Sequence, residues 1–261
     1  MKKMIAMILV LMFALSAAAV AEGYTFKMGF DAEYPPYSYM DDNGDYTGYD
    51  VEMCQAVCEI LGWDLELVPI NWDTKLITLD AGEHDCIWSG LTIDVLDSEA
   101  YSISMAYSNN SQVILTTASS GIATLADLAD KIVGVQLGTS ADILLQNEQA
   151  ELAATFNGGE PMRFENYNVC FTELMAGSID AIAIDYPVAM NKIQEYGEEY
   201  VILDESIAAE QYGICFRKDD ADICEAVEGA FMQLVEDGTY VSLAEKYELD
   251  TGALCLIPDA E

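Results

Sequence analysis

The stretch DCIWSGLTIDVLD, residues 85–97, decides how the rest of the chain is interpreted. Its first four residues, 85–88, are largely apolar and β-prone and predict a short buried strand. Ser89, Gly90 and Thr92 follow directly. In a parallel α/β sheet, ligands bind just beyond the carboxyl ends of the strands. A small residue, a glycine and a hydroxyl residue at that place leave backbone N–H groups and one O–H free to face a small solute, although an ordinary turn also fits this stretch alone.

Strand and helix patterns alternate on both sides of this stretch, without a short-period repeat. The alternation predicts an α/β protein made of two lobes of similar construction, and the chain is long enough for both. The expected strands are 24–30, 65–69, 85–88, 112–117, 132–136, 161–165, 181–184, 201–203 and 212–216. The expected helices are 51–61 with Asp50 as its cap, 71–79, 124–130, 167–176, 188–195, 221–236 and 239–247, with one more beginning at 141.

The first residues predict a secretory signal peptide. Two lysines follow Met1, residues 4–15 form an apolar run, and residues 19–21 read AVA. This order describes a signal peptide that is cut after Ala21, and an uncleaved anchor is the alternative. No Cys follows the apolar run as a lipoprotein anchor would require, and no later run has the length of a membrane span. We therefore expect a periplasmic or extracellular protein.

Composition excludes some classes of partner. The chain has 46 acidic and 10 basic residues, which gives a formal net charge of −36. A field of this sign repels nucleic acid and anionic lipid, so we expect neither as a partner. The seven cysteines are odd in number, no C-x-x-C pair occurs, and the one histidine is His84. The sequence therefore predicts no metal site and no cofactor.

Four expected strands are followed by groups suited to a small ligand. Asp31 follows the first with Tyr34 close behind, and residues 89–92 follow another. Residues 138–140, Gly-Thr-Ser, precede a helix, whose free N–H groups favour an anion such as a carboxylate. Asp185 follows four apolar residues, where a carboxylate is costly unless it is paired. We expect an ammonium group as its partner.

Two aromatic residues complete the candidate site. Trp72 stands at a helix start, and Tyr34 stands beside two prolines that stiffen its loop. Their rings offer flat apolar faces to a side chain, or cation–π contacts to a cation. Taken singly, Trp72 fits a core residue and the polar groups fit caps or turn formers. Taken together, at the carboxyl ends of several strands, they favour one shared cleft.

The sequence resembles a known family over essentially the whole chain after residue 21. The resemblance rests on motifs that occur in the expected order: FDAEYPPYSY, GYDVEM, NWD, SGLTI, VGVQLGTS, LMAGSIDAIAIDYP, EQYGICF and EDGTY. They look like polar amino acid-binding proteins of ABC importers, the type II periplasmic solute-binding proteins. The resemblance implies two lobes joined by two hinge strands, each lobe a mixed β-sheet flanked by helices. Lobe 1 would be 22–108 plus 209–261, and lobe 2 would be 109–208.

The resemblance also implies roles for residues of the site. Tyr34 and Trp72 would enclose the ligand side chain, and Asp185 would take the α-ammonium group. From lobe 1, the α-amino group and the α-carboxylate would be held by Ser89, Gly90 and Thr92. Thr139 would add a carboxylate contact from lobe 2. The full predicted ligand-binding set is Asp31, Tyr34, Trp72, Ser89, Gly90, Thr92, Asp97, Gln136, Thr139, Ser140 and Asp185.

One position departs from the family pattern. An arginine is expected five residues after Thr92, where it would clamp the α-carboxylate, but this chain has Asp97 there. No basic residue lies between Lys75 and Lys131. The loss of a buried charge-assisted pair would weaken binding by roughly 2–5 kcal/mol. Either the carboxylate is held by hydroxyl and backbone donors, or the ligand is an amine or other cationic solute that has no carboxylate.

The main hypothesis is therefore a monomeric, non-enzymatic solute-binding protein that captures a small polar amino acid by closing two lobes. It would deliver the solute to an ABC permease in the membrane. The binder of an amine is the first alternative. An enzyme of the cyclohexadienyl dehydratase type on the same fold is the second, and a sensor that presents its ligand to a membrane receptor is the third.

Overall fold

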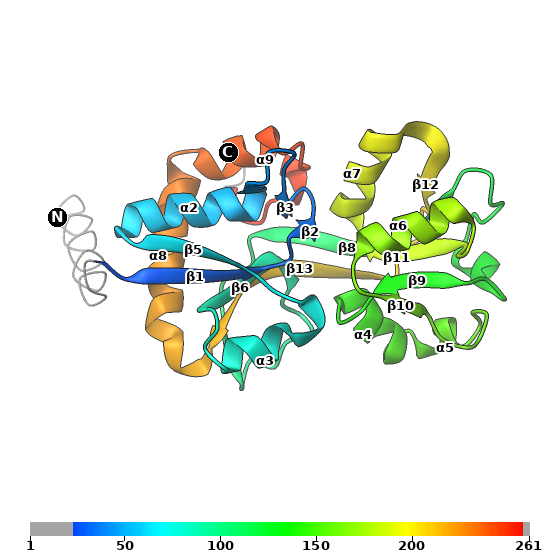
Figure 1. The fold of residues 1–261 in the computed structure, drawn as a ribbon, viewed down its shortest axis with the longest axis horizontal. Coiled ribbons are helices and arrows are strands. Elements are labelled where there is room, and N and C mark those ends of the chain that lie inside the picture. Colours follow the sequence, from blue (N-terminus) through cyan, green and yellow to red (C-terminus); the bar gives the residue numbers. More distant parts are fainter. Residues whose placement is uncertain (1–22, 258–261) are drawn as a thin grey trace.

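The computed structural model describes residues 23–257 (Figure 1). The predicted signal peptide and its cleavage point lie outside these residues. Strands of the main sheet are β1 (Thr25–Phe30), β5 (Asp64–Pro69), β6 (Cys86–Thr92), β7 (Tyr101–Ile103), β8 (Ser108–Thr117), β9 (Val133–Gln136), β10 (Met162–Phe164), β11 (Ala181–Asp185), β12 (Tyr200–Ile202) and β13 (Ala208–Arg217). A small second sheet contains β2 (Glu33–Tyr34), β3 (Ser38–Met40) and β4 (Tyr46–Thr47).

Helices flank the main sheet on both sides. The α-helices are α2 (Tyr49–Leu61), α3 (Lys75–Asp80), α4 (Ser140–Gln146), α5 (Ala150–Ala153), α6 (Tyr167–Ala176), α7 (Tyr186–Tyr196), α8 (Ala221–Glu236) and α9 (Thr239–Lys246). Short 3-10 helices are η2 (Trp72–Thr74), η3 (Leu125–Leu128), η4 (Gly197–Glu199), η5 (Lys218–Asp220) and η6 (Thr251–Ala253). The predicted helix at 124–130 is thus only the short η3, while the one at 71–79 divides into η2 and α3.

The main sheet runs through two lobes, which confirms the predicted fold class. Its strand order is β10-β9-β11-β8-β13-β6-β1-β5, with β12 beside β8 and β7 beside β13. Strand β1 is parallel to β5 and β6, and β9 is parallel to β10 and β11. Figure 1 shows β1, β5 and β6 with α2, α3, α8 and α9 in one lobe, here called lobe 1. Strands β9–β12 with helices α4–α7 form the other, here called lobe 2.

Two long strands connect the lobes. Strands β8 and β13 pair antiparallel from Ala208 opposite Gln112 to Tyr212 opposite Ser108. Further along, β13 pairs with β6 of lobe 1 and β8 pairs with β11 of lobe 2. Strand β13 begins four residues before the predicted 212, because residues 208–211 pair with β8 between the lobes.

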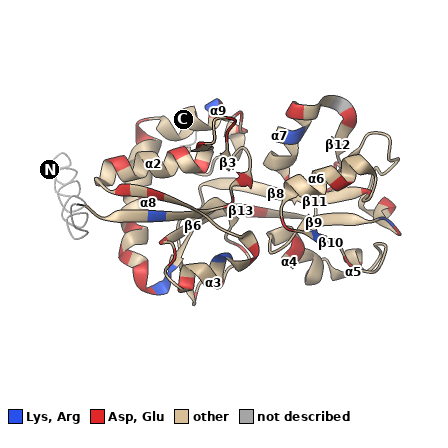
Figure 2. Cartoon of the chain, in the orientation of Figure 1, with Lys and Arg blue, Asp and Glu red and all other residues tan. Residues whose placement is uncertain are grey.

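Acidic side chains are spread over both lobes, with few basic ones among them (Figure 2). None of the helices within residues 23–257 has the length and apolar character needed to cross a membrane. In the same part of the chain, no cluster of three or more His, Cys, Asp or Glu side chains could hold a metal ion.

Candidate functional site

A small cavity lies between the lobes, with a volume of about 70 Å³. A cavity needs roughly 10–15 Å³ measured in this way to hold one water molecule, so the lobes already close around a space for only a few waters. The walls come from η2, α3 and β6 of lobe 1 and from β11 and the start of α4 in lobe 2. They consist of Tyr34, Trp72, Lys75, Leu76, Gly90, Leu91, Thr92, Val95, Leu96, Gly138, Thr139, Ser140, Ile143 and Asp185.

Most of the predicted site residues meet at this cavity. Seven of the predicted eleven line it: Tyr34, Trp72, Gly90, Thr92, Thr139, Ser140 and Asp185. Asp31, Ser89 and Gln136 are buried close to it but do not line it. Asp97 is exposed, and its carboxylate accepts a hydrogen bond from the backbone N–H of Glu99 at 2.9 Å. Because Asp97 caps its own turn, it does not bring a negative charge to the cavity wall.

Asp31 and Gln136 join the two lobes. The Gln136 amide donates to the Asp31 carboxylate at 2.7 Å. The backbone N–H of Asp31 reaches Ser89 Oγ at 3.2 Å, and the hydroxyls of Ser89 and Ser38 lie 2.5 Å apart. Ser89 therefore holds the Asp31 loop against β6, and its hydroxyl is engaged within lobe 1.

Gly90 differs from the expectation that its N–H faces the solute. Its N–H donates to Asp50 Oδ2 at 2.6 Å, and the Tyr107 hydroxyl donates to the same oxygen at 2.8 Å. Helix α2 begins after Gly48, so Asp50 lies inside its first turn with no exposed surface. What Gly90 supplies is space, because a Cβ there would lie 2.6 Å from the Tyr34 ring and its φ of +51° suits glycine.

Asp185, which lines the cavity, forms a buried acidic pair with Glu210, which lies behind the cavity wall. Asp185 Oδ1 accepts hydrogen bonds from Asn110 Nδ2 at 2.7 Å, Gln112 Nε2 at 2.6 Å and the Tyr212 hydroxyl at 2.7 Å. Glu210 Oε1 accepts from the same two amides at 2.6 and 2.8 Å, and from Thr92 Oγ1 at 2.7 Å. Each amide has two N–H hydrogens and can direct one to each carboxylate.

The acidic pair is desolvated and has no basic partner. Asp185 is 3% and Glu210 6% exposed, and no ion pair among the described residues includes either one. Burial raises the pKa of the Asp185 carboxyl, and burial together with the nearby Asp185 raises the pKa of Glu210 to about 7. Such a pair attracts a cation, because an ammonium group would neutralise charge that water no longer solvates.

The buried carboxyls predict a pH dependence of stability. Burial raises the pKa of Asp50 and of Glu210 to about 7 each, well above the unfolded range of about 4. Between these values the folded chain holds protons that the unfolded chain releases, so this stabilisation is lost as pH rises through 7. We expect the Tm of the ligand-free protein to rise from pH 8 to pH 6.5. Differential scanning fluorimetry should show a smaller rise in Glu210→Gln, and a flat wild-type profile would contradict the assignment.

Sequence reasoning missed Glu210 and Lys75 as site residues. The sequence did offer a signal for Glu210, an acidic residue next to the predicted lobe boundary at 208/209. The neighbours of Glu210 could not be inferred without the pairing of β8 with β13. Lys75 follows Trp72 by three residues, so helical spacing places both on one face. Lys75 is 8% exposed, and its Nζ donates to Trp72 O at 3.2 Å and, across the lobes, to Gly138 O at 2.6 Å.

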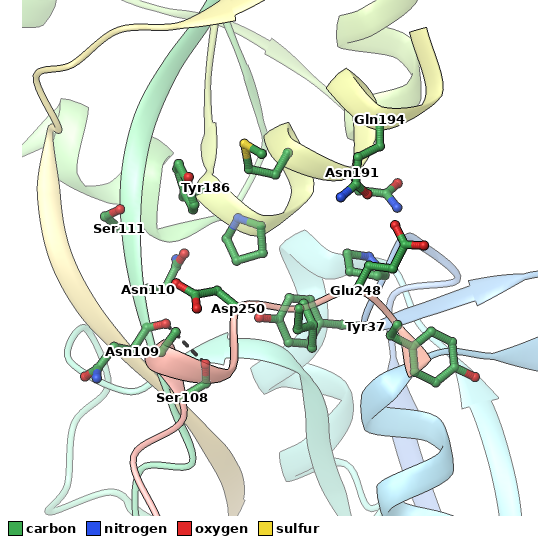
Figure 3. Close-up of a pocket in the computed structure, with 16 residues that line it drawn as sticks. Tyr37, Ser108, Asn109, Asn110, Ser111, Tyr186, Asn191, Gln194, Glu248 and Asp250 are labelled. Carbon is green, nitrogen blue, oxygen red and sulfur yellow. Dashed lines mark hydrogen bonds between the residues drawn. The ribbon is translucent and has the colours of Figure 1, made fainter. Parts of the chain in front are cut away.

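A larger cavity, of about 430 Å³, lies elsewhere between the lobes (Figure 3). Its walls are α7, the start of β8, the Pro36–Tyr37 turn and the segment 247–253. Figure 3 shows Tyr186 and Asn191 of α7 facing Glu248 and Asp250. Its lining residues in the described chain include no lysine or arginine. Of the predicted site residues, none lines this larger cavity, so the smaller one remains the candidate site.

Comparison with known proteins identifies the family of the chain. Residues 26–250 match the model of a family described as bacterial extracellular solute-binding proteins, family 3. The L-cystine-binding protein TcyJ of Escherichia coli K12 is 31% identical over 231 residues, covering 87% of this chain and 84% of TcyJ.

Two solved structures are also similar. One is an ABC uptake transporter substrate-binding protein from Streptococcus pneumoniae with bound histidine, at 28% identity and a TM-score of 0.82, covering 85% of this chain and 92% of that one. The other is the ancestral amino acid-binding protein AncCDT-1, a precursor of cyclohexadienyl dehydratase, at 32% identity and a TM-score of 0.77, covering 85% and 95%. The chain belongs to the bacterial extracellular solute-binding proteins, family 3.

Proposed function

We propose that the protein captures a small polar amino acid between its two lobes and delivers it to an ABC permease in the membrane. The observation that carries this proposal is the buried Asp185 carboxylate at the interlobe cavity, next to Glu210 and without a basic partner among the described residues. The α-ammonium group of the ligand would neutralise it. Relatives and similar structures are amino acid-binding proteins, which supports the same interpretation.

The capture mechanism is closure about the hinge strands. Residues 22–108 with 209–261 would move against residues 109–208, with β8 and β13 as the flexible connection. Opening must break the hydrogen bonds from Gln136 to Asp31 and from Lys75 to Gly138, which join the lobes. An amino acid between Tyr34 and Trp72 would restore the closed state, with Thr139 near its carboxylate.

The cellular setting follows from the family and from the N-terminal sequence. We propose that the protein is exported and cut after Ala21, and relatives described as periplasmic support the export. We propose that it acts as a monomer and binds without chemistry, as the relatives named as binding proteins suggest. Turnover of prephenate or arogenate by the purified protein would instead support a dehydratase.

A thermal-shift screen tests the proposal. The purified protein is heated with each of the twenty common L-amino acids, with L-cystine, and with the amines that remain when the carboxylate of each is removed. We expect at least one L-amino acid to raise the Tm and to titrate with a stoichiometry near one by calorimetry. Binding of amines alone would instead favour a carrier of cationic solutes. The buried carboxyls of Asp185 and Glu210 are the observation that supports this second candidate function. No shift with any compound would contradict both.

A further inference from the structure

We propose that Lys75 is the cationic partner of the ligand's carboxylate in the interlobe cavity. This inference rests on the proposed function and names the class of ligand, a zwitterion instead of an amine. Asp97 occupies the position where a basic residue was expected, and the structure places it on the surface. Lys75 is the basic side chain among the described residues that line the cavity.

Lys75 is buried without a direct ion pair, although the carboxylates of Asp73, Asp142 and Asp31 lie near enough to favour its charged form. Its Nζ contacts the carbonyl oxygens of Trp72 and Gly138 and lies 4.8 Å from the centre of the Trp72 ring. None of the ion pairs formed by residues 23–257 includes it. Burial lowers the pKa of Lys75 to about 8, as expected for an ammonium group removed from water without a bound anion.

The position of Lys75 suits a carboxylate in particular. The Gly138 carbonyl that it contacts belongs to the peptide leading to Thr139, a residue that also lines the cavity. A carboxylate placed there would contact the ammonium group of Lys75 from lobe 1 and the residues around Thr139 from lobe 2. Asp185 lines the same cavity with opposite charge. One cavity thus offers a cation and an anion, which a zwitterion satisfies and a simple amine does not.

A purely mechanical role is the competing explanation. Lys75 already bonds Gly138 across the lobes, so its loss could weaken every ligand by destabilising the closed state. The two roles differ in what they predict for a ligand without a carboxylate. A mechanical latch contributes equally to an amino acid and its amine, whereas a carboxylate partner favours the amino acid alone.

The test compares matched ligands on matched variants. The ligand pair is the amino acid with the highest affinity in the screen and the amine left by removal of its carboxylate, such as histidine with histamine or cystine with cystamine. The variants are wild type, Lys75→Met, which keeps the apolar stem, and Lys192→Met as control. Lys192 is also 8% exposed but pairs with Glu195 at 2.9 Å and does not line the cavity.

We expect wild type and Lys192→Met to prefer the amino acid, and Lys75→Met to lose about tenfold or more of that preference, as for a hydrogen bond to a charged group. An equal loss for both ligands, an unchanged preference, or a wild type without preference for the amino acid would overturn the inference. With any of these three results, the proposed function would still stand as long as the wild-type protein binds an amino acid. Absence of amino acid binding by wild type would overturn both.

Discussion

Asp185→Asn is expected to weaken amino acid binding strongly while leaving the fold intact. The substitution removes the charge that we assign to the ligand's ammonium group. Loss of one partner of a buried charged pair weakens binding by roughly 2–5 kcal/mol, which is about 30-fold or more. Calorimetric titration with the best amino acid measures this loss.

The thermal stability of ligand-free Asp185→Asn should not fall along with its affinity. Burial raises the pKa of Asp185, so its ionised form costs folding free energy in the ligand-free protein. The side-chain amide of asparagine still offers an oxygen that accepts the Tyr212 hydrogen bond, but it carries no charge. We therefore expect the Tm of the variant to equal or exceed that of wild type. Asp85→Asn is the control, because Asp85 pairs with Arg217 at 3.1 Å at the other end of β6. It should lower the Tm and retain binding. Normal affinity in Asp185→Asn would mean that the ammonium site lies elsewhere.

Gly138→Ala is expected to impair lobe closure. Gly138 lies between β9 and α4 of lobe 2, and a Cβ on it would stand 2.8 Å from the backbone Cα of Asp73 in lobe 1. Backbone atoms of η2 cannot move aside as a flexible side chain can. Overpacking of this kind costs ~1–3 kcal/mol, so ligand affinity should fall by roughly 5- to 150-fold.

Gly121→Ala is the control that distinguishes impaired lobe closure from the backbone strain that alanine causes at a positive φ. Both glycines have φ of +74°, but a Cβ at Gly121 has no atom within 4 Å. Both variants should therefore lose stability similarly, while only Gly138→Ala should bind weakly. Small-angle X-ray scattering should show ligand-induced compaction for wild type and Gly121→Ala and less for Gly138→Ala. Full affinity and compaction in Gly138→Ala would show that the lobes approach differently in the complex.

Local patterns in the sequence predict much of the fold. Alternation of apolar strands and helices gives the α/β class, and residues at the carboxyl ends of strands β1, β6, β9 and β11 meet near one cavity, although β6 and β11 extend further than expected and include Thr92 and Asp185. The carboxyl ends of parallel strands lie at one edge of a sheet, so short-range patterns suffice for this part.

Other parts of the site depend on contacts distant in sequence. The expectation that Asp50 caps a helix and that Gly90 offers a free N–H failed together, because Asp50 Oδ2 binds that N–H across 40 positions. Glu210 meets Thr92 and Asn110 only through the pairing of β13 with β6 and β8. Counting five residues from Thr92 puts Asp97 where the family has an arginine that binds the ligand's carboxylate. In the structure, Asp97 caps its own turn and is exposed to solvent.

A crystal structure of the complex with the best-binding amino acid would show where the ligand's ammonium group is held. We expect one ligand between Tyr34 and Trp72, with its ammonium nitrogen within hydrogen-bond distance of the Asp185 carboxylate. Gln136 and Asp31 would remain in contact across the lobes. A ligand bound instead against Glu248 and Asp250 in the larger cavity, with Asp185 untouched, would contradict it.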